Sequence, residues 1–225
     1  AEAMAAVKVP GGLRPAWARA ALASLVMVAG AVPQLSVEPW RPGFGFDWKA
    51  FPVRACDWMA AHGVRGRSFG ALHFAGYQLW RFWPERDRLP FMDIHQTGTL
   101  ADQTLYAHSW SSPEAWQALD ARYRFGYVLL PAHGFPGQDL LDRMDADSTW
   151  SLVFLDDTAA LYLRREGPMA ALAGRWRYAI VPAGDRAVPR MNAVFLEGPE
   201  HRRMMRAELE RQGGEAKWTA RANGM

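Results

Sequence analysis

The most apolar stretch of the chain lies near its beginning. Residues 20–37 contain no charged side chain, and small and apolar residues dominate them. In a helix with a rise of about 1.5 Å per residue, a stretch of this length approaches the thickness of the hydrocarbon core of a membrane. The pattern therefore predicts one transmembrane helix over residues 20–37, preceded by an N-terminal flank over residues 1–19.

Residues of the kind that anchor a helix in a membrane stand within and around this stretch. Trp17 and Arg19 precede it, and Pro39 and Trp40 follow it. Tryptophan is enriched at membrane–water interfaces, and proline ends helices. The residues expected to anchor the chain, with membrane lipid as a partner, are Trp17, Arg19, Leu22, Leu25, Val26, Met27, Val28 and Trp40.

Two other interpretations of residues 20–37 stay open. Ala29, Gly30 and Ala31 fit the small-residue cleavage point of a signal peptide or signal anchor. A buried core helix is the other interpretation, although such a helix normally carries a polar face. The first residue is Ala1 rather than Met, which predicts either a processed N-terminus or part of a longer protein.

Basic residues flank the apolar stretch almost evenly. Three precede it and two follow it, namely Lys8, Arg14 and Arg19, then Arg41 and Lys49. Because basic residues favour the cytoplasmic side of a membrane, this difference favours an N-terminus inside the cell. The rest of the chain is then expected outside.

Helical and strand-like patterns alternate after a linker over residues 38–51 that is rich in Pro, Gly and aromatic residues. Helices are expected from Pro52 to Gly63, over 77–83, from Ser112 and over 138–144, and strands over 67–74, 89–94, 127–130, 150–155 and 160–163. Asp156, Asp157 and Thr158 predict a turn that makes the last two strands an antiparallel hairpin. The alternation predicts a three-layer, mostly parallel α/β domain of about five strands over residues 52–165.

The last part of the chain, residues 166–225, has the pattern of a helical extension. Helices are expected over residues 169–176 and from Pro199. The second of these is strongly charged, and Met205 and Leu209 give it only a narrow apolar edge. Since such a helix buries little surface by itself, we expect it to pack on a neighbour.

Charge and cysteine content exclude several classes of protein. The chain has 26 Lys and Arg against 23 Asp and Glu, and the basic residues are scattered, which argues against a nucleic-acid partner. Cys56 is the single cysteine, so an internal disulfide is excluded, and we expect it to be packed rather than reactive. Pairs of Trp residues, such as Trp80 with Trp83, fit either a membrane interface or a core.

Four polar residues follow the predicted strands. In a parallel sheet, ligands bind beyond the carboxyl ends of the strands. The candidate ligand-binding residues are therefore His73, Asp93, His95 and His133, and Asp156 could join them. Such groups bind a divalent metal or act as acid and base. The alternative is a set of hydrogen-bonded loop residues, because no local spacing connects them. Whether a metal binds stays open, no cofactor is expected, and no catalytic triad is found.

Several segments, taken in order, carry a resemblance to a known family. They are Gly66-x-Ser68-Phe69, Ala75-Gly76-Tyr77-Gln78-Leu79-Trp80, Phe91-Met92-Asp93, Tyr127-Val128-Leu129-Leu130 and the run from Trp150 to Asp157. Over about residues 20–165 the chain resembles the C-terminal soluble domain, with the last transmembrane helix, of bacterial multi-pass membrane proteins related to GT-C glycosyltransferases and oligosaccharyltransferases. After Asp93 that family commonly has Gly and Arg, where this chain has Ile94 and His95.

The resemblance implies a periplasmic α/β domain on the outside of a bacterial inner membrane. The catalytic acidic residues of that family lie in loops between upstream transmembrane helices, and this sequence contains no counterpart. We therefore expect a noncatalytic, membrane-anchored accessory subunit or domain that packs with other membrane protein subunits, for example of an envelope, photosynthetic or respiratory assembly. The alternatives are the C-terminal periplasmic domain of a GT-C-like transferase of lipid-linked sugars and a small metal- or ligand-binding α/β domain.

Overall fold

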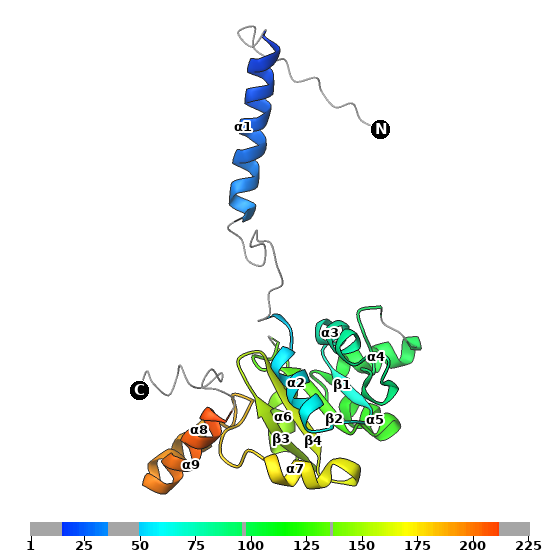
Figure 1. Cartoon of the computed structure of the whole chain (residues 1–225), viewed down its shortest axis with the longest axis vertical. Coiled ribbons are helices and arrows are strands. Elements are labelled where there is room, and N and C mark those ends of the chain that lie inside the picture. Colours follow the sequence, from blue (N-terminus) through cyan, green and yellow to red (C-terminus); the bar gives the residue numbers. More distant parts are fainter. Residues whose placement is uncertain (1–14, 36–49, 96–97, 136, 212–225) are drawn as a thin grey trace. The chain divides into compact units, whose positions relative to one another are not determined.

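The computed structural model describes residues 15–35, 50–95, 98–135 and 137–211 (Figure 1). The chain divides into two compact units, Ala1–Phe46 and Asp47–Met225. The first contributes the helix α1 (Ala16–Leu35), and the second contributes an α/β domain.

After Arg19, the described side chains of α1 are uncharged and mostly apolar. Leu25, Val26, Met27 and Val28 are exposed by 64, 63, 72 and 59%. The predicted helix is therefore present and begins at Ala16. Within the described part of the chain, however, no helix combines the length and the apolar character that crossing a membrane requires. The predicted anchor residue Trp40 lies outside the described residues.

The sheet of the α/β domain has four strands among the described residues. They are β1 (Ser68–Gly70), β2 (Tyr127–Pro131), β3 (Trp150–Leu155) and β4 (Ala159–Arg164), in the order β1-β2-β4-β3. Only β1 and β2 are parallel, because β4 pairs antiparallel with both β2 and β3. The predicted α/β class is thus confirmed. The prediction of a mostly parallel sheet of five strands is wrong.

Two of the predicted strands fail for local reasons. The strand expected over residues 67–74 is only three residues long, because the helix α3 (Leu72–Phe82) starts directly after it. The strand expected over residues 89–94 is reduced to an isolated bridge between Pro90 and Ser68. Proline has no N–H to donate, so it cannot continue a ladder of backbone hydrogen bonds.

The turn between β3 and β4 forms as the sequence predicts. The carboxylate of Asp156 accepts hydrogen bonds from the backbone N–H groups of Thr158 (2.9 Å) and Ala159 (2.7 Å). An Asp side chain that bonds its own backbone in this way stabilises a tight turn. Asp156 is therefore a turn residue at the end of the hairpin.

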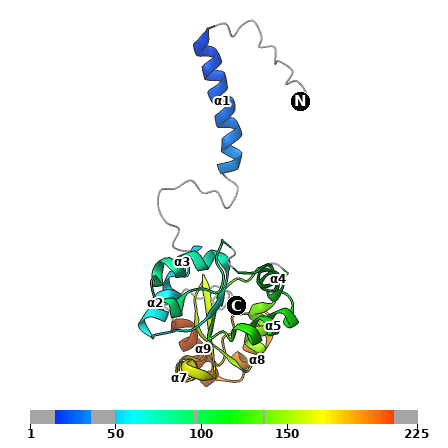
Figure 2. The ribbon, with the colours of Figure 1, turned by 90° about the vertical axis from the view of Figure 1, so that its right-hand side faces the viewer.

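Helices cover both sides of the sheet, as Figure 2 shows. They are α2 (Val53–Ala61), α3, α4 (Leu100–Ser109), α5 (Pro113–Tyr123), α6 (Leu140–Ala146), α7 (Ala170–Trp176), α8 (Val188–Leu196) and α9 (Pro199–Glu210). The sequence predicted all but α4 and α8. Two predicted helix caps are also confirmed. Ser112 caps the N-terminus of α5. Gly63, which has a φ of +67°, follows the C-terminus of α2.

The core lies on both faces of the sheet. Every residue of β3 and all but the last of β2 and β4 are buried. A strand buried on both faces needs an unbroken apolar run, which Tyr127–Pro131 has. Trp58, Trp110, Trp116 and Trp150 belong to this core, whereas Trp80 and Trp83 are exposed by 70 and 69%.

Candidate functional site

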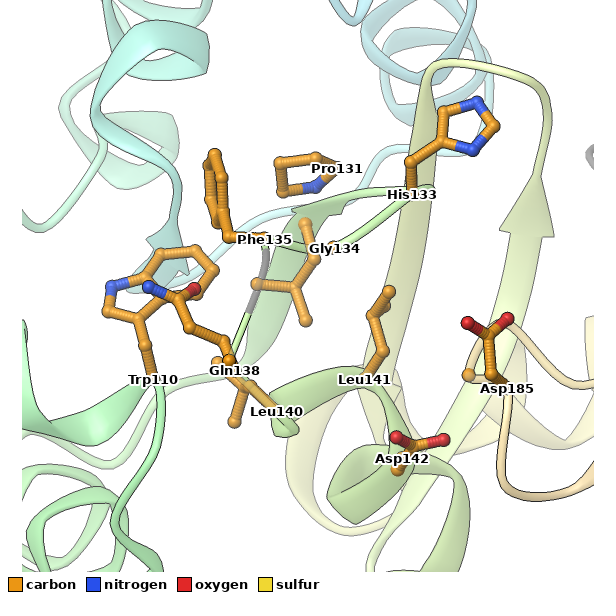
Figure 3. Close-up of a pocket in the computed structure, with 13 residues that line it drawn as sticks. Trp110, Pro131, His133, Gly134, Phe135, Gln138, Leu140, Leu141, Asp142 and Asp185 are labelled. Carbon is orange, nitrogen blue, oxygen red and sulfur yellow. The ribbon is translucent and has the colours of Figure 1, made fainter.

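A pocket of about 350 Å³ lies beyond the carboxyl end of β2 (Figure 3). The chain leaves β2 at Pro131, forms a loop, and then enters α6 at Leu140. Residues 184 and 185, which precede α8, close another side. This is the position where α/β sheets bind ligands. Among the residues that line the pocket are Trp110, His133, Phe135, Gln138, Asp142 and Asp185.

One wall of this pocket is aromatic. The rings of Trp110 and Phe135 meet edge to face, with their centroids 5.4 Å apart. The ring of His73 also meets Phe135 edge to face, with the two centroids 5.9 Å apart. Figure 3 shows the amide of Gln138 next to the Trp110 indole. This wall therefore offers apolar rings with a single neutral amide, which suits contact with a small, partly apolar ligand.

The opposite side of the pocket carries carboxylates (Figure 3). Asp142 accepts a hydrogen bond from the backbone N–H of Arg186 at 2.7 Å. The guanidinium of Arg186 lies 3.8 Å from Asp142 and 3.5 Å from Asp139. Asp139 in turn pairs with Arg143 at 2.8 Å. The acidic groups thus hold the wall of the pocket together, which makes them poor candidates for free acids or bases.

The partly buried carboxyl group of Asp145 supports the same wall. Asp145 accepts hydrogen bonds from the hydroxyl of Tyr162 and from the backbone N–H of Gly184, both at 2.7 Å. Burial raises the pKa of Asp145 from its ordinary value to about 6, against the opposing effect of these hydrogen bonds. Glycine is required at 184, because a Cβ there would lie 2.8 Å from the backbone of Asp142.

The structure separates the four predicted ligand-binding residues. His73 and His133 do follow β1 and β2, and His133 lines the pocket. Partial burial lowers the pKa of His73. Asp93 lies instead in the loop after Pro90, where its carboxylate accepts a hydrogen bond from the backbone N–H of His95 at 2.9 Å. Asp93 is therefore a hydrogen-bonded loop residue, which is the alternative that the sequence left open.

Among the residues that the structure places, the groups needed for metal binding or nucleophilic attack do not assemble. Within the ranges that the structure describes, no group of three or more His, Cys, Asp or Glu residues is arranged to hold a metal ion. Cys56 is fully buried, and burial raises the pKa of its thiol to about 12. A thiol with that pKa stays protonated at neutral pH and is a packed side chain.

Sequence reasoning missed most of the residues that line the pocket. Trp110 ends α4, a helix that was not predicted, and Phe135 and Gln138 lie in the loop before α6. One signal for α4 was available, since Thr99 and Asp102 form a capping box at its start. Nothing in the local sequence brings Gly184 and Asp185 to the end of β2, because that contact depends on the fold.

Over its described ranges the protein is thus an α/β protein with a four-stranded mixed sheet, and a small, neutral to acidic cavity lies at the end of β2. Comparison of the chain with models of known protein families, with curated proteins and with solved structures finds no match.

Proposed function

We propose that this chain is a membrane-anchored accessory domain without an active site of its own, held by α1 in a larger assembly of the bacterial inner membrane. Its α/β domain then lies on the periplasmic side. Three features support the proposal, namely the apolar surface of α1, the absence of a catalytic constellation among the described residues of the pocket, and two exposed tryptophans.

The apolar surface of α1 carries the proposal. Leu25, Val26, Met27 and Val28 are consecutive, and successive residues of a helix are turned by about 100°, so these four side chains surround the helix. All four are exposed by more than half. A helix that is apolar all round is stable only when something apolar covers it. A membrane and neighbouring helices are the surroundings that do so.

Small residues on α1 favour contact with other helices within the membrane. Ala21, Ala23, Ser24, Ala29 and Gly30 belong to this helix, and a Cβ added to Gly30 would meet nothing within 4 Å. In lipid, helix association depends on close approach of backbones at such residues. We therefore propose protein subunits, as well as lipid, as the partners of α1.

The two exposed tryptophans fit a domain that lies against a polar membrane surface. Trp80 is on α3 and Trp83 follows it, and neither joins the core. An indole ring is partly apolar and carries one N–H, so it prefers the interface between lipid and water. These positions supply a second contact with the membrane that does not depend on α1.

Membrane extraction tests the proposal directly. The full chain, expressed in bacteria, is expected in the membrane fraction and should resist alkaline carbonate. The double substitution Leu25→Glu and Val28→Glu places two charges on α1 and should release the chain into the supernatant. The matched control, Leu25→Ile with Val28→Leu, keeps α1 apolar and should stay in the membrane. Release of the unaltered chain by carbonate would contradict membrane anchoring.

The accessory role is tested separately from the anchor. In mild detergent from its native membrane, the chain should migrate as part of a complex of defined stoichiometry. Migration as a monomer would count against an assembly, while leaving the anchor intact. The alternative of a GT-C-like transferase domain predicts many transmembrane spans encoded upstream in the same gene, which the complete gene sequence shows directly.

A further inference from the structure

A second cavity, of about 200 Å³, lies beside the edge strand β3. Its walls come from the end of α6, from β3 and β4, from the segment that follows α7, and from α8. Three arginines line it: Arg165, Arg177 and Arg190. Asp145 is the one acidic residue among its described lining residues. The cavity is therefore positively charged, in contrast to the pocket at the end of β2.

The three arginines reach this cavity from different parts of the fold. Arg165 follows β4, and Arg177 is the residue that caps the C-terminus of α7. Arg190 lies on α8, and Met191 and Val194 of this helix and its N-cap residue Ala187 also line the cavity. Their spacing of three, four and seven residues defines one face of a helix. That face of α8 points toward the cavity and carries Arg190 with it.

These arginines are available to an anion. None of the three forms an ion pair with another residue in the described part of the chain. Arg165 is nevertheless oriented, because its Nε donates a hydrogen bond of 2.8 Å to the hydroxyl of the buried Ser151. The one carboxyl group among the lining residues, that of Asp145, already accepts hydrogen bonds from Tyr162 and Gly184. An oriented guanidinium without a carboxylate partner favours an anionic ligand.

The same part of the chain already holds one anion. The carboxylate of Glu208, on α9, accepts hydrogen bonds from the consecutive backbone N–H groups of Ala179, Ile180 and Val181 at 2.7, 3.0 and 2.9 Å. Consecutive N–H groups that converge on one anion make a concave binding site. Residues 179–181 also line the arginine cavity. Because Glu208 already occupies their N–H groups, the positive charge of the cavity comes from its three arginines alone.

We propose that this cavity binds a phosphate group, with the guanidinium groups of Arg165, Arg177 and Arg190 as its contacts. A phosphate carries nearly two negative charges and three acceptor oxygens, so it can meet three separate guanidinium groups. A carboxylate has only two oxygens and one charge. The phosphate belongs either to a soluble phosphomonoester or to a lipid headgroup. This site does not rest on the membrane anchor proposed above.

Calorimetric titration of the full chain in mild detergent tests this site. Inorganic phosphate and glycerol 3-phosphate are the soluble probes. Both are expected to bind saturably, and Arg177→Gln or Arg190→Gln should each weaken binding by about tenfold. The matched control is Arg203→Gln, on the exposed side of α9, which removes the same charge and should leave binding unchanged. Thermal unfolding of each variant confirms that the fold is kept.

Sedimentation with vesicles separates the two sources of phosphate. Vesicles of phosphatidylcholine, with or without phosphatidic acid, are compared for the chain and its arginine variants. If phosphatidic acid increases vesicle binding and this increase requires Arg177 and Arg190, the ligand is a lipid headgroup. If the soluble probes bind saturably but phosphatidic acid does not increase vesicle binding, the ligand is a soluble phosphate. The proposal is overturned if neither type of probe binds, or if Arg203→Gln weakens binding as much as the cavity variants.

Discussion

Two regions of the α/β domain are stabilised by different means. The central strands β2 and β4 are buried among apolar side chains, with Leu129 and Leu161 fully inaccessible. Residues 179–186 also bury apolar side chains, Val181 and Ala183 among them, but three carboxylates in addition bind their backbone N–H groups. Asp142 and Asp145 on α6 and Glu208 on α9 supply these carboxylates. Apolar burial is insensitive to pH, whereas a segment held by carboxylates is not.

The difference matters because residues 179–186 form part of both cavities. Gly184 and Asp185 line the pocket at the end of β2, and residues 179–182 line the arginine cavity. The sheet fixes one side of each cavity permanently. The carboxylates fix the other side, so the groups that hold this segment also decide the shape of the two cavities.

The largest effect is expected in the sheet. Leu161→Ala removes a fully buried side chain from the strand that pairs with both β2 and β3, so it should lower the free energy of unfolding by about 4 kcal/mol. Chemical denaturation measures this loss. Leu196→Ala, at a position exposed by 78%, is the control and should change little. A small loss at Leu161 would mean that β4 is not the centre of the core.

A smaller and more local effect is expected for Glu208. Glu208→Ala leaves three N–H groups of residues 179–181 without their acceptor, which should cost about 3 kcal/mol. Hydrogen exchange should become faster at these amides and stay slow in β2 and β4. Glu210→Ala, at an exposed position two residues further along α9, should leave exchange unchanged. Equal acceleration across the sheet would contradict two separately stabilised regions.

Asp145 should make stability depend on pH. Its pKa is raised from 3.8 to about 6 in the folded state, so the folded state holds its proton more tightly than the unfolded state. The stabilisation from this proton is complete below about pH 4 and is lost as the pH rises to about 6, by at most about 3 kcal/mol. Asp145→Asn cannot ionise and should lack this contribution.

The measurement is the difference between the two proteins across this pH range. Some other carboxyl groups have lowered pKa values, as Asp102 does through its hydrogen bonds with Tyr123 and Thr99. These groups change the free energy of unfolding with pH in the opposite direction, and they do so equally in the unaltered protein and in Asp145→Asn. Urea unfolding of each protein at several pH values therefore isolates Asp145. Parallel curves for the two proteins would show that Asp145 is not buried in the folded state.

The smallest changes in stability are expected when two glycines are replaced by alanine. Gly184→Ala brings a Cβ to within 2.8 Å of the Asp142 backbone and should cost about 2 kcal/mol, with faster exchange in residues 179–186. Gly174→Ala, inside α7 with nothing within 4 Å, should instead stabilise the protein by about 0.5 kcal/mol. Thermal unfolding of both variants checks the opposite signs. A stabilising Gly184→Ala would mean that the contact with Asp142 is not tight.

Much of the secondary structure could be predicted because its signals are local. Ser112 before Pro113 marks the start of α5, and Asp156 marks the turn of the hairpin. The order of the strands could not be predicted. Whether β2 pairs with β3 or with β4 is decided by packing between segments that are about thirty residues apart, for which the local pattern carries no signal.

In the candidate sites, the difference between what local sequence predicts and what depends on the fold is larger. His133 was expected at the end of β2 and lies there, because a strand end can be read from its sequence. Asp93 and His95 were expected with it and lie in a separate loop, because the strand predicted before them does not form. The arginine cavity was not foreseen, since its three arginines are far apart in the sequence and each looks like a surface charge.

Local sequence patterns were enough to predict the apolar helix at the beginning of the chain, the α/β class, the hairpin and most of the helices. These depend on periodicity and on side chains that bond their own neighbours. Three features became visible only in the folded chain: the mixed sheet, the hydrogen bonds of Glu208 to residues 179–181, and the position of Arg165, Arg177 and Arg190 around one cavity. These features join distant residues, and it is the burial of shared surface rather than local pattern that brings them together.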